Sequence, residues 1–190
     1  MQPIAPLMME HRLIERMIAL MQEELARIRD NVAIDPEFAF VDLVFIDTAV
    51  DFLRTYADRC HHGKEEDILF AELAKKDLSP ELHKIMAELT AEHAWGRETT
   101  ANLVKAKENY LREEQEALNL ILRYLRELTE FYPKHIEKED KHFFIPCLEY
   151  FTQAEKDEML EKMWEFDRKL VHEKYTAVVA QIESRRACGL

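Results

Sequence analysis

The chain has 190 residues, of which 47% are hydrophobic and 34% charged, and its formal net charge is −12. This length suits one domain with a substantial core, so we expect residues 1–190 to form a single domain. The 3 glycines and 6 prolines are too few for the many tight turns of an all-β fold. The acidic balance argues against nucleic acid or an anionic membrane as the main partner, because both attract a positively charged surface.

No targeting or membrane-spanning signal is evident in the sequence. The amino-terminal residues lack a basic stretch followed by an apolar run, and no segment has the roughly 20 apolar residues that a bilayer requires. Cys60, Cys147 and Cys188 contain no CxxC pair, so neither a disulfide framework nor a zinc ribbon is indicated. We therefore expect a cytoplasmic protein.

Helical spacing of the apolar residues, together with residues typical of helix ends, predicts five long helices. Asp35 before Pro36 and Ser79 before Pro80 are typical pairs of an N-cap residue and a first-turn proline. A capping-box pattern begins at Thr152. The predicted helices span about residues 6–29, 36–75, 80–110, 113–150 and 153–186.

Long helices joined by short connections pack most simply as antiparallel neighbours. The sequence therefore predicts an all-α fold, an antiparallel up-down four-helix bundle with an additional C-terminal helix. Pro133 and Pro146 fall within the fourth helix and can kink it, because proline removes a backbone donor. The fifth helix is expected to cover one face of the bundle or to form a dimer contact.

Two segments of the chain resemble each other, HHGKEEDILF at residues 61–70 and HIEKEDKHFF at residues 135–144. Aligned without a gap, His61 falls on His135 and Glu65 falls on Glu139. Each copy places a histidine and a carboxylate four residues apart, on one face of a helix and one turn from each other. Two matched pairs on separate helices indicate a shared metal site.

His11 and His93 lie on the other two helices of the predicted bundle, and each follows a glutamate. At roughly 1.5 Å of rise per residue, antiparallel packing brings both to broadly the same level as the two repeated pairs, although the first helix fits least well. The predicted metal ligands are His11, His61, Glu65, His93, His135 and Glu139.

Two carboxylates that bridge two ions, with terminal imidazoles, suit iron or manganese better than zinc, which prefers four-coordinate sites. Six protein ligands cannot saturate two six-coordinate ions, so positions remain for an oxo or hydroxo bridge and for a small ligand such as O2 or NO. Bound metal also removes the cost of burying two unpaired glutamates. We expect two non-haem iron ions as the cofactor.

At these residues the sequence resembles the hemerythrin-like (HHE) family, over roughly residues 8–147. The shared features are a lone histidine on the first helix, HxxxE followed by LF on the second, EH on the third, and HxxxE followed by FF on the fourth. The resemblance implies a four-helix bundle around a di-iron centre held by the same six residues.

One position departs from the oxygen-carrying members of the family. They place a further histidine four residues after the one on the third helix, where this chain has Arg97. A set of four histidines and two glutamates is instead similar to the di-iron domain of bacterial proteins implicated in repairing iron–sulfur centres after nitrosative or oxidative stress.

Two alternatives remain open at the predicted site. His62 with Glu66 has the same spacing one residue along, and only the alignment with the second copy favours His61 with Glu65. A single ExxH ends at His142, and ferritin-like di-iron bundles use that pattern twice.

The remaining candidates have ordinary interpretations. His142 is expected to be packed, exposed or placed behind a ligand, and His83 and His172 are expected to be exposed. Cys60 is either a redox thiol or a small buried hydrophobe.

Three functions are consistent with the sequence. The first is a non-haem di-iron protein that binds or senses O2, NO or iron. The second is a di-iron protein that repairs iron–sulfur centres or detoxifies NO or peroxide. The third is a helical interaction module with a structural metal. The expected partners are a small diatomic ligand, a redox partner and a second copy of the chain in a homodimer.

Overall fold

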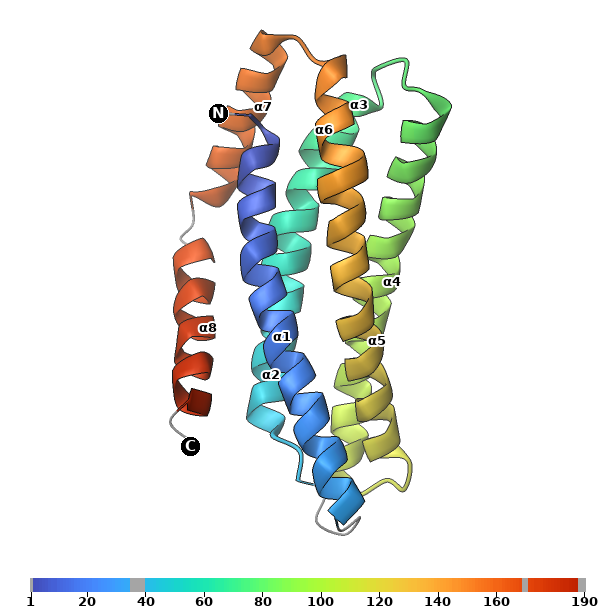
Figure 1. The fold of residues 1–190 in the computed structure, drawn as a ribbon, viewed down its shortest axis with the longest axis vertical. Coiled ribbons are helices and arrows are strands. Elements are labelled where there is room, and N and C mark those ends of the chain that lie inside the picture. Colours follow the sequence, from blue (N-terminus) through green and yellow to red (C-terminus); the bar gives the residue numbers. More distant parts are fainter. Residues whose placement is uncertain (1, 35–39, 169–170, 188–190) are drawn as a thin grey trace.

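The computed structural model describes residues 2–34, 40–168 and 171–187. Four long helical segments in this part of the chain run antiparallel to their sequence neighbours and form an up-down bundle (Figure 1). None of the described residues lies in a β-strand. The predicted all-α bundle is confirmed.

The first two segments cross the bundle from opposite ends. The second helix was predicted to begin at Asp35 and Pro36, which lie outside the described residues, but residues 40–42 are not helical. Asp42 is the N-cap instead, because its side chain accepts a hydrogen bond from the backbone N–H of Phe45. The first segment is α1 (Ile4–Ile34), and the second contains α2 (Leu43–Phe52), η2 (Leu53–His62), η3 (Glu65–Phe70) and α3 (Ala71–Leu73).

The third segment and the end of the fourth follow the predicted boundaries, whereas the fourth begins at Ala117, four residues after its predicted start at about residue 113. Ser79 is the N-cap of the third, and its side chain accepts from the N–H of Leu82. Pro133 lies within the fourth segment without ending it, and the amide of Gln22 donates at 3.4 Å to the carbonyl of Thr129, which Pro133 leaves free. The segments are α4 (Pro80–Leu111), then α5 (Ala117–Lys138), η4 (Glu139–Phe143), α6 (Phe144–Cys147) and the short 3₁₀ helix η5 (Leu148–Tyr150).

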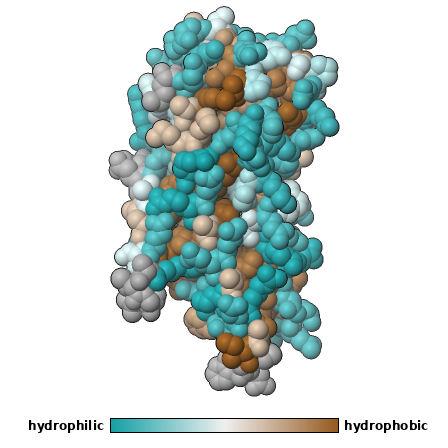
Figure 2. Space-filling view, viewed as in Figure 1, coloured by the Kyte–Doolittle hydropathy of each residue, from teal (hydrophilic) through white to brown (hydrophobic). Residues whose placement is uncertain are grey.

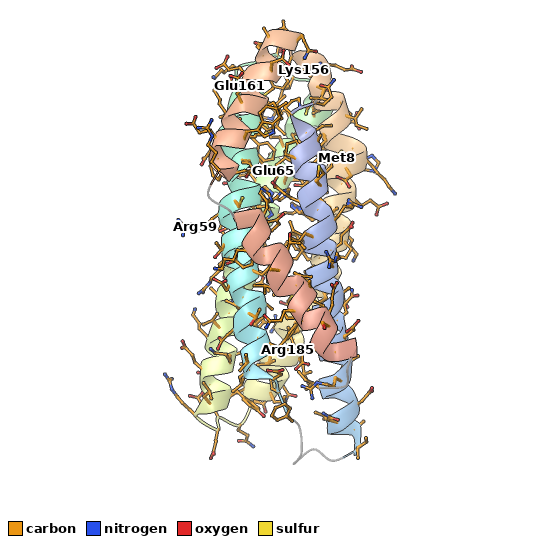
Figure 3. The ribbon with its side chains drawn as sticks, turned by 90° about the vertical axis from the view of Figure 1, so that its left-hand side faces the viewer. Met8, Arg59, Glu65, Lys156, Glu161 and Arg185 are labelled. Atoms are coloured by element: carbon orange, nitrogen blue, oxygen red, sulfur yellow. The ribbon has the colours of Figure 1, made fainter. Side chains whose placement is uncertain are left out.

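The C-terminal part of the chain covers one face of the bundle. The predicted capping box is present, and it opens α7 (Gln153–Asp167). The predicted single fifth helix is divided, because α7 ends at Asp167 and α8 (Val171–Ala187) begins four residues later. In Figure 3 α8 runs obliquely across the bundle, and its Tyr175 packs edge-on against the Phe52 ring.

Two hydrophobic clusters fill the bundle, one toward each end. The larger includes Met17 of α1 and Leu125 of α5, and the smaller includes Leu7 of α1 and Phe143 of η4. Between them lies a layer of buried histidine and glutamate side chains, among them Glu65, which points between the helices in Figure 3.

The outer surface differs sharply from this interior. The face shown in Figure 2 is mostly hydrophilic, with apolar side chains gathered in separate small patches. Within the described ranges, no helix is long and apolar enough to cross a membrane.

Candidate metal centre

The buried polar layer contains all six residues that the sequence predicted as metal ligands, and it adds His62. Each of these seven side chains belongs to a residue that is at most 2% exposed. They form two groups in which the possible donor atoms lie within 4.8 Å of one another. One group is His11, His61, Glu65 and Glu139, and the other is His62, His93 and His135.

The two glutamates face both groups. One carboxylate oxygen of Glu65 lies 3.5 Å from Nε2 of His61, and the other lies 3.3 Å from Nε2 of His93. Glu139 likewise places one oxygen 3.2 Å from Nε2 of His11 and the other 3.1 Å from Nε2 of His135. Each carboxylate is therefore oriented to bridge two ions.

Four imidazoles form hydrogen bonds to carboxylates that are not themselves candidate ligands. In each case Nδ1 donates to the carboxylate at 2.7–2.8 Å, which leaves Nε2 facing the interior. Hydrogen bonds of this kind fix the orientation and the basicity of metal-binding histidines. The pairs are His11 with Asp140, His61 with Glu10, His93 with Glu66, and His135 with Glu92.

Each of these four carboxylates also forms an ion pair with an arginine or lysine side chain. Arg97 donates to Glu66 at 3.0 Å and to Asp58 at 2.7 Å, so the residue in place of the further histidine supports the partner of His93. The other three pairs are Arg12 with Asp140, Lys64 with Glu10, and Lys138 with Glu92.

His62 was considered in the sequence only as a rival to His61, yet both imidazoles are buried in the layer. The chain is π-helical over η2 and η3. Hydrogen bonds from residue i to i+5 widen the turn, so neighbouring residues point more nearly to one side than in an α-helix. The His62 ring stacks on that of His93 with centroids 3.9 Å apart. Glu66, the other half of the rival pair, instead supports His93 from behind.

The buried polar atoms of the layer provide a test of whether metal fits. Nε2 of His93 and of His135, both nitrogens of His62 and all four oxygens of Glu65 and Glu139 have no directed hydrogen bond. Leaving such groups unpaired is costly, and a divalent ion would satisfy them together. Nε2 of His11 lies 2.9 Å from Nε2 of His61, and two nitrogens bound at right angles to one ion would be about 3 Å apart. The donor set fits two ions.

Without metal, protons on the histidines balance part of the negative charge of the two glutamates. Burial lowers the pKa of the histidines, but the surrounding carboxylates outweigh it and raise the pKa to about 10 for His11, about 11 for His93 and about 9 for His135. His62 is the exception, because burial and the neighbouring imidazoles lower its pKa. Burial alone would raise the pKa of Glu139, yet the imidazoles hold it well below its ordinary value.

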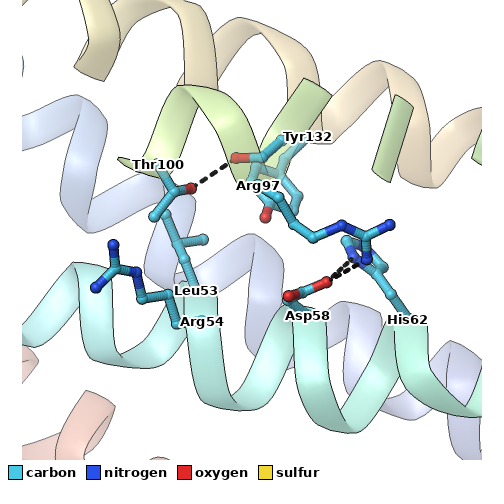
Figure 4. A pocket seen from close by; sticks show the side chains of 8 residues that line it. Leu53, Arg54, Asp58, His62, Arg97, Thr100 and Tyr132 are labelled. Atoms are coloured by element: carbon cyan, nitrogen blue, oxygen red, sulfur yellow. Dashed lines mark hydrogen bonds and ion pairs between the residues drawn. The ribbon is translucent and has the colours of Figure 1, made fainter. Parts of the chain in front are cut away.

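A small cavity of about 210 Å³ borders this layer (Figure 4). It is lined by His62, Arg97 and Tyr132, among other residues, and the ion pair of Arg97 with Asp58 lies beside the His62 ring. Of the seven side chains of the layer, His62 is the one that lines this cavity.

The remaining candidate residues lie elsewhere. His83 and His142 are exposed, as expected for the first and as one of the interpretations of the second. His172 was expected to be exposed but is about one-third exposed, with Nδ1 accepting from the hydroxyl of Tyr56 at 2.9 Å. Cys60 is buried, and burial raises the pKa of its thiol to about 12, which favours the packing interpretation over a redox thiol.

A third group of possible donors comprises Glu10, Cys60, Asp167 and His172. Here the ammonium of Lys64 already contacts both carboxylates, so a divalent ion would have to displace it. None of the nitrogen or oxygen atoms of these side chains is among the buried atoms without a partner. This group is a paired charge cluster and differs in kind from the other two.

A comparison with known families gives a match that covers most of the bundle. The model of the hemerythrin HHE cation-binding domain matches residues 2–145. The chain belongs to the hemerythrin HHE family. No curated protein and no solved structure gives a significant match.

Membership of the hemerythrin HHE family agrees with the geometry of the buried layer. The matched range contains all seven side chains of the two groups, and the family is defined by cation binding. The matched range ends before α7 and α8.

Proposed function

We propose that this hemerythrin HHE protein holds two non-haem iron ions and binds or senses a small ligand such as O2 or NO. The observation that carries the proposal is the pair of bridging carboxylates, Glu65 and Glu139, each with one oxygen toward each histidine group. Carboxylate bridges with terminal imidazoles favour iron or manganese over zinc.

The protein donors divide unequally between the two ions. His11 and His61 would hold one ion, His62, His93 and His135 would hold the other, and both glutamates would serve each. If both ions are six-coordinate and share one solvent ligand, these donors leave a single open position, on the ion with two histidines. When bound, the metal pair would supply that position and the electrons for reversible ligand binding.

The protein around the site restricts what can bind there. All seven side chains are almost fully buried, so a large substrate cannot reach the donor atoms. The cavity beside His62 offers space for a diatomic molecule next to the layer, on the side of the ion that would have three histidines. These features support a small-ligand function in preference to catalysis on a bulky substrate.

His62 also affects the comparison with iron–sulfur repair proteins. That comparison rested on a count of four histidines, and the structure brings a fifth imidazole into the layer. His62 thus supplies the further imidazole that oxygen-carrying members of the family have at the position of Arg97. We therefore favour reversible binding or sensing over repair or detoxification.

Anaerobic loading with ferrous iron tests the proposal. We expect about two irons per chain, and an optical change on adding O2 or NO that reverses when the gas is removed. An irreversible change with turnover of the gas would support the detoxifying alternative. Absence of any change, with zinc substituting freely, would leave only a structural metal and would contradict the proposal.

A further inference from the structure

The paired charge cluster beside the metal centre connects His61 to the two C-terminal helices. Glu10 accepts from Nδ1 of His61 at 2.8 Å, and its other oxygen contacts the ammonium of Lys64. Lys64 also donates to Asp167 at 2.6 Å. Nε2 of His172 lies 3.1 Å from the same Asp167 oxygen and 3.3 Å from Glu10. An unbroken chain of polar contacts thus runs from a candidate metal ligand to α7 and α8.

The carboxylate bonded to His61 is more deeply buried than the carboxylates bonded to the other three histidines. The carboxylate behind His61 is only 2% exposed, whereas the side chains of Asp140, Glu66 and Glu92 are 16%, 29% and 28% exposed. The other three carboxylates can therefore exchange hydrogen bonds with water. Glu10 depends on protein partners for its orientation.

The buried ammonium of Lys64 also depends on a partner in α7. Its side chain is fully buried, and a buried ammonium is costly unless it is paired. Glu10 is shared with His61, so Asp167 supplies the balancing charge. Asp167 is the last residue of α7, and His172 lies in the first turn of α8. Asp167 and His172 thus lie on either side of the division between α7 and α8, and both contact the charge cluster.

We propose that Asp167 and His172 are positioning residues for the metal ligand His61, acting through Glu10 and Lys64. The proposal rests on the proposed di-iron function and extends it to residues outside the matched family range. In this arrangement the C-terminal helices complete the outer shell of one ion, the one held by His11 and His61. The ion held by the other three histidines has no contact of this kind with α7 or α8 among the described residues.

The variants Asp167→Asn and His172→Phe separate this role from general stability. Loss of the hydrogen-bond partner of a metal-binding histidine lowers metal affinity roughly 10–100-fold. Asp167 and His172 lie one contact beyond that partner, so we expect each variant to lower the affinity for one of the two ions about tenfold. The second ion should bind as in the wild-type protein.

Two control variants on the same helices keep the comparison matched. Tyr175→Phe removes a hydrogen bond from α8 to Asp51 while keeping the ring, and it lies outside the charge cluster. Glu161→Gln removes an exposed charge from α7. Neither should change metal binding.

The experiment is an anaerobic ferrous iron titration of the full chain against a competing chelator, with circular dichroism as the check on folding. In the metal-free protein, the imidazole N–H resonances of labelled histidine report the His61–Glu10 hydrogen bond directly. We expect Asp167→Asn and His172→Phe to weaken one equivalent and to shift the His61 resonance, leaving that of His93 in place.

Three results would overturn the inference. Folded variants that bind both equivalents like the wild type, with an unshifted His61 resonance, would refute it and leave the di-iron proposal intact. Equal weakening of both equivalents together with lost helicity would show a purely structural role. If the wild-type chain itself failed to bind two ions, the proposed function would fail first, and this inference with it.

Discussion

At the scale of single residues, adjacent histidines with different surroundings define the site. His61 has its Nδ1 bound to Glu10, whereas the nearest carboxylate oxygen to Nδ1 of His62 is that of Asp58 at 3.5 Å. Both nitrogens of His62 are buried without a directed hydrogen bond. A neutral imidazole in that state is most readily explained as a ligand.

Replacing His62 tests this explanation. We expect His62→Ala to lower the affinity of one ion at least tenfold, because it removes one of that ion's three terminal donors. The measurement is metal content after dialysis against a chelator. His142→Ala is the matched control, since His142 is exposed, and it should retain both ions. Full metal retention in His62→Ala would remove His62 from the ligand set.

The bridging role predicts a different result for the glutamates. Glu139→Ala should lower the content of both ions, because each oxygen faces a different histidine group. Glu137→Ala, two residues earlier and 56% exposed, should change neither. Loss of only one ion from Glu139→Ala would show that this carboxylate is a terminal ligand.

The sequence predicts six of the seven layer residues because they follow α-helical spacing. The repeat places a histidine and a glutamate one turn apart on two helices, and antiparallel packing brings them level with His11 and His93. His62 could not be predicted in this way. In an α-helix its side chain would point about 100° away from that of His61, and the π-helical turn, which is wider, reduces that angle.

At the scale of helices, the ends are predictable where a side chain caps them. Ser79 and Thr152 both act as the sequence indicates. The start of α2 differs from the prediction because Asp42 supplies its cap, and the Asp35–Pro36 pair lies outside the described residues. The division between α7 and α8 has no comparable sequence signal, and Asp167 at the end of α7 contacts Lys64, which lies far away in the chain.

Thr152→Ala tests how firmly α7 is held at its start. The Thr152 hydroxyl accepts from the N–H of Glu155, whose carboxylate accepts from the N–H of Thr152 at 2.8 Å. Losing this cap should cost about 1 kcal/mol of stability. Urea denaturation measures the cost, and hydrogen exchange should show faster opening of α7 than of α4. Thr152→Ser should behave like the wild type; an equal loss in both variants would contradict the capping role.

At the scale of the whole molecule, the metal-free bundle carries two hydrophobic clusters separated by a layer of charge. Its stability then depends on what neutralises Glu65 and Glu139. Protons on the histidines do so in the absence of metal, because their pKa values of about 9 to 11 lie above the ordinary value of 6.5. Metal and protons therefore compete for the same atoms.

This competition predicts different pH dependences for the metal-free and the iron-loaded protein. A raised folded-state pKa gives stability that is complete below pH 6.5 and is lost as pH rises through the folded pKa. The metal-free protein should therefore lose stability between pH 6.5 and 9, by up to about 1.4 kcal/mol per pH unit for each retained proton. The iron-loaded protein should keep its stability over the same range, because its metal-bound histidines have no proton to lose. Thermal unfolding of both forms measures this; identical slopes would contradict the competition.

In the proposed site, two ions share the carboxylates of Glu65 and Glu139. The most direct test is a Mössbauer spectrum of the oxidised protein, loaded with isotopically enriched iron, at liquid-helium temperature. Bridged ferric ions couple antiferromagnetically, so we predict quadrupole doublets without magnetic splitting for essentially all the iron. Magnetically split spectra of isolated ferric ions, at any loading, would contradict the claim.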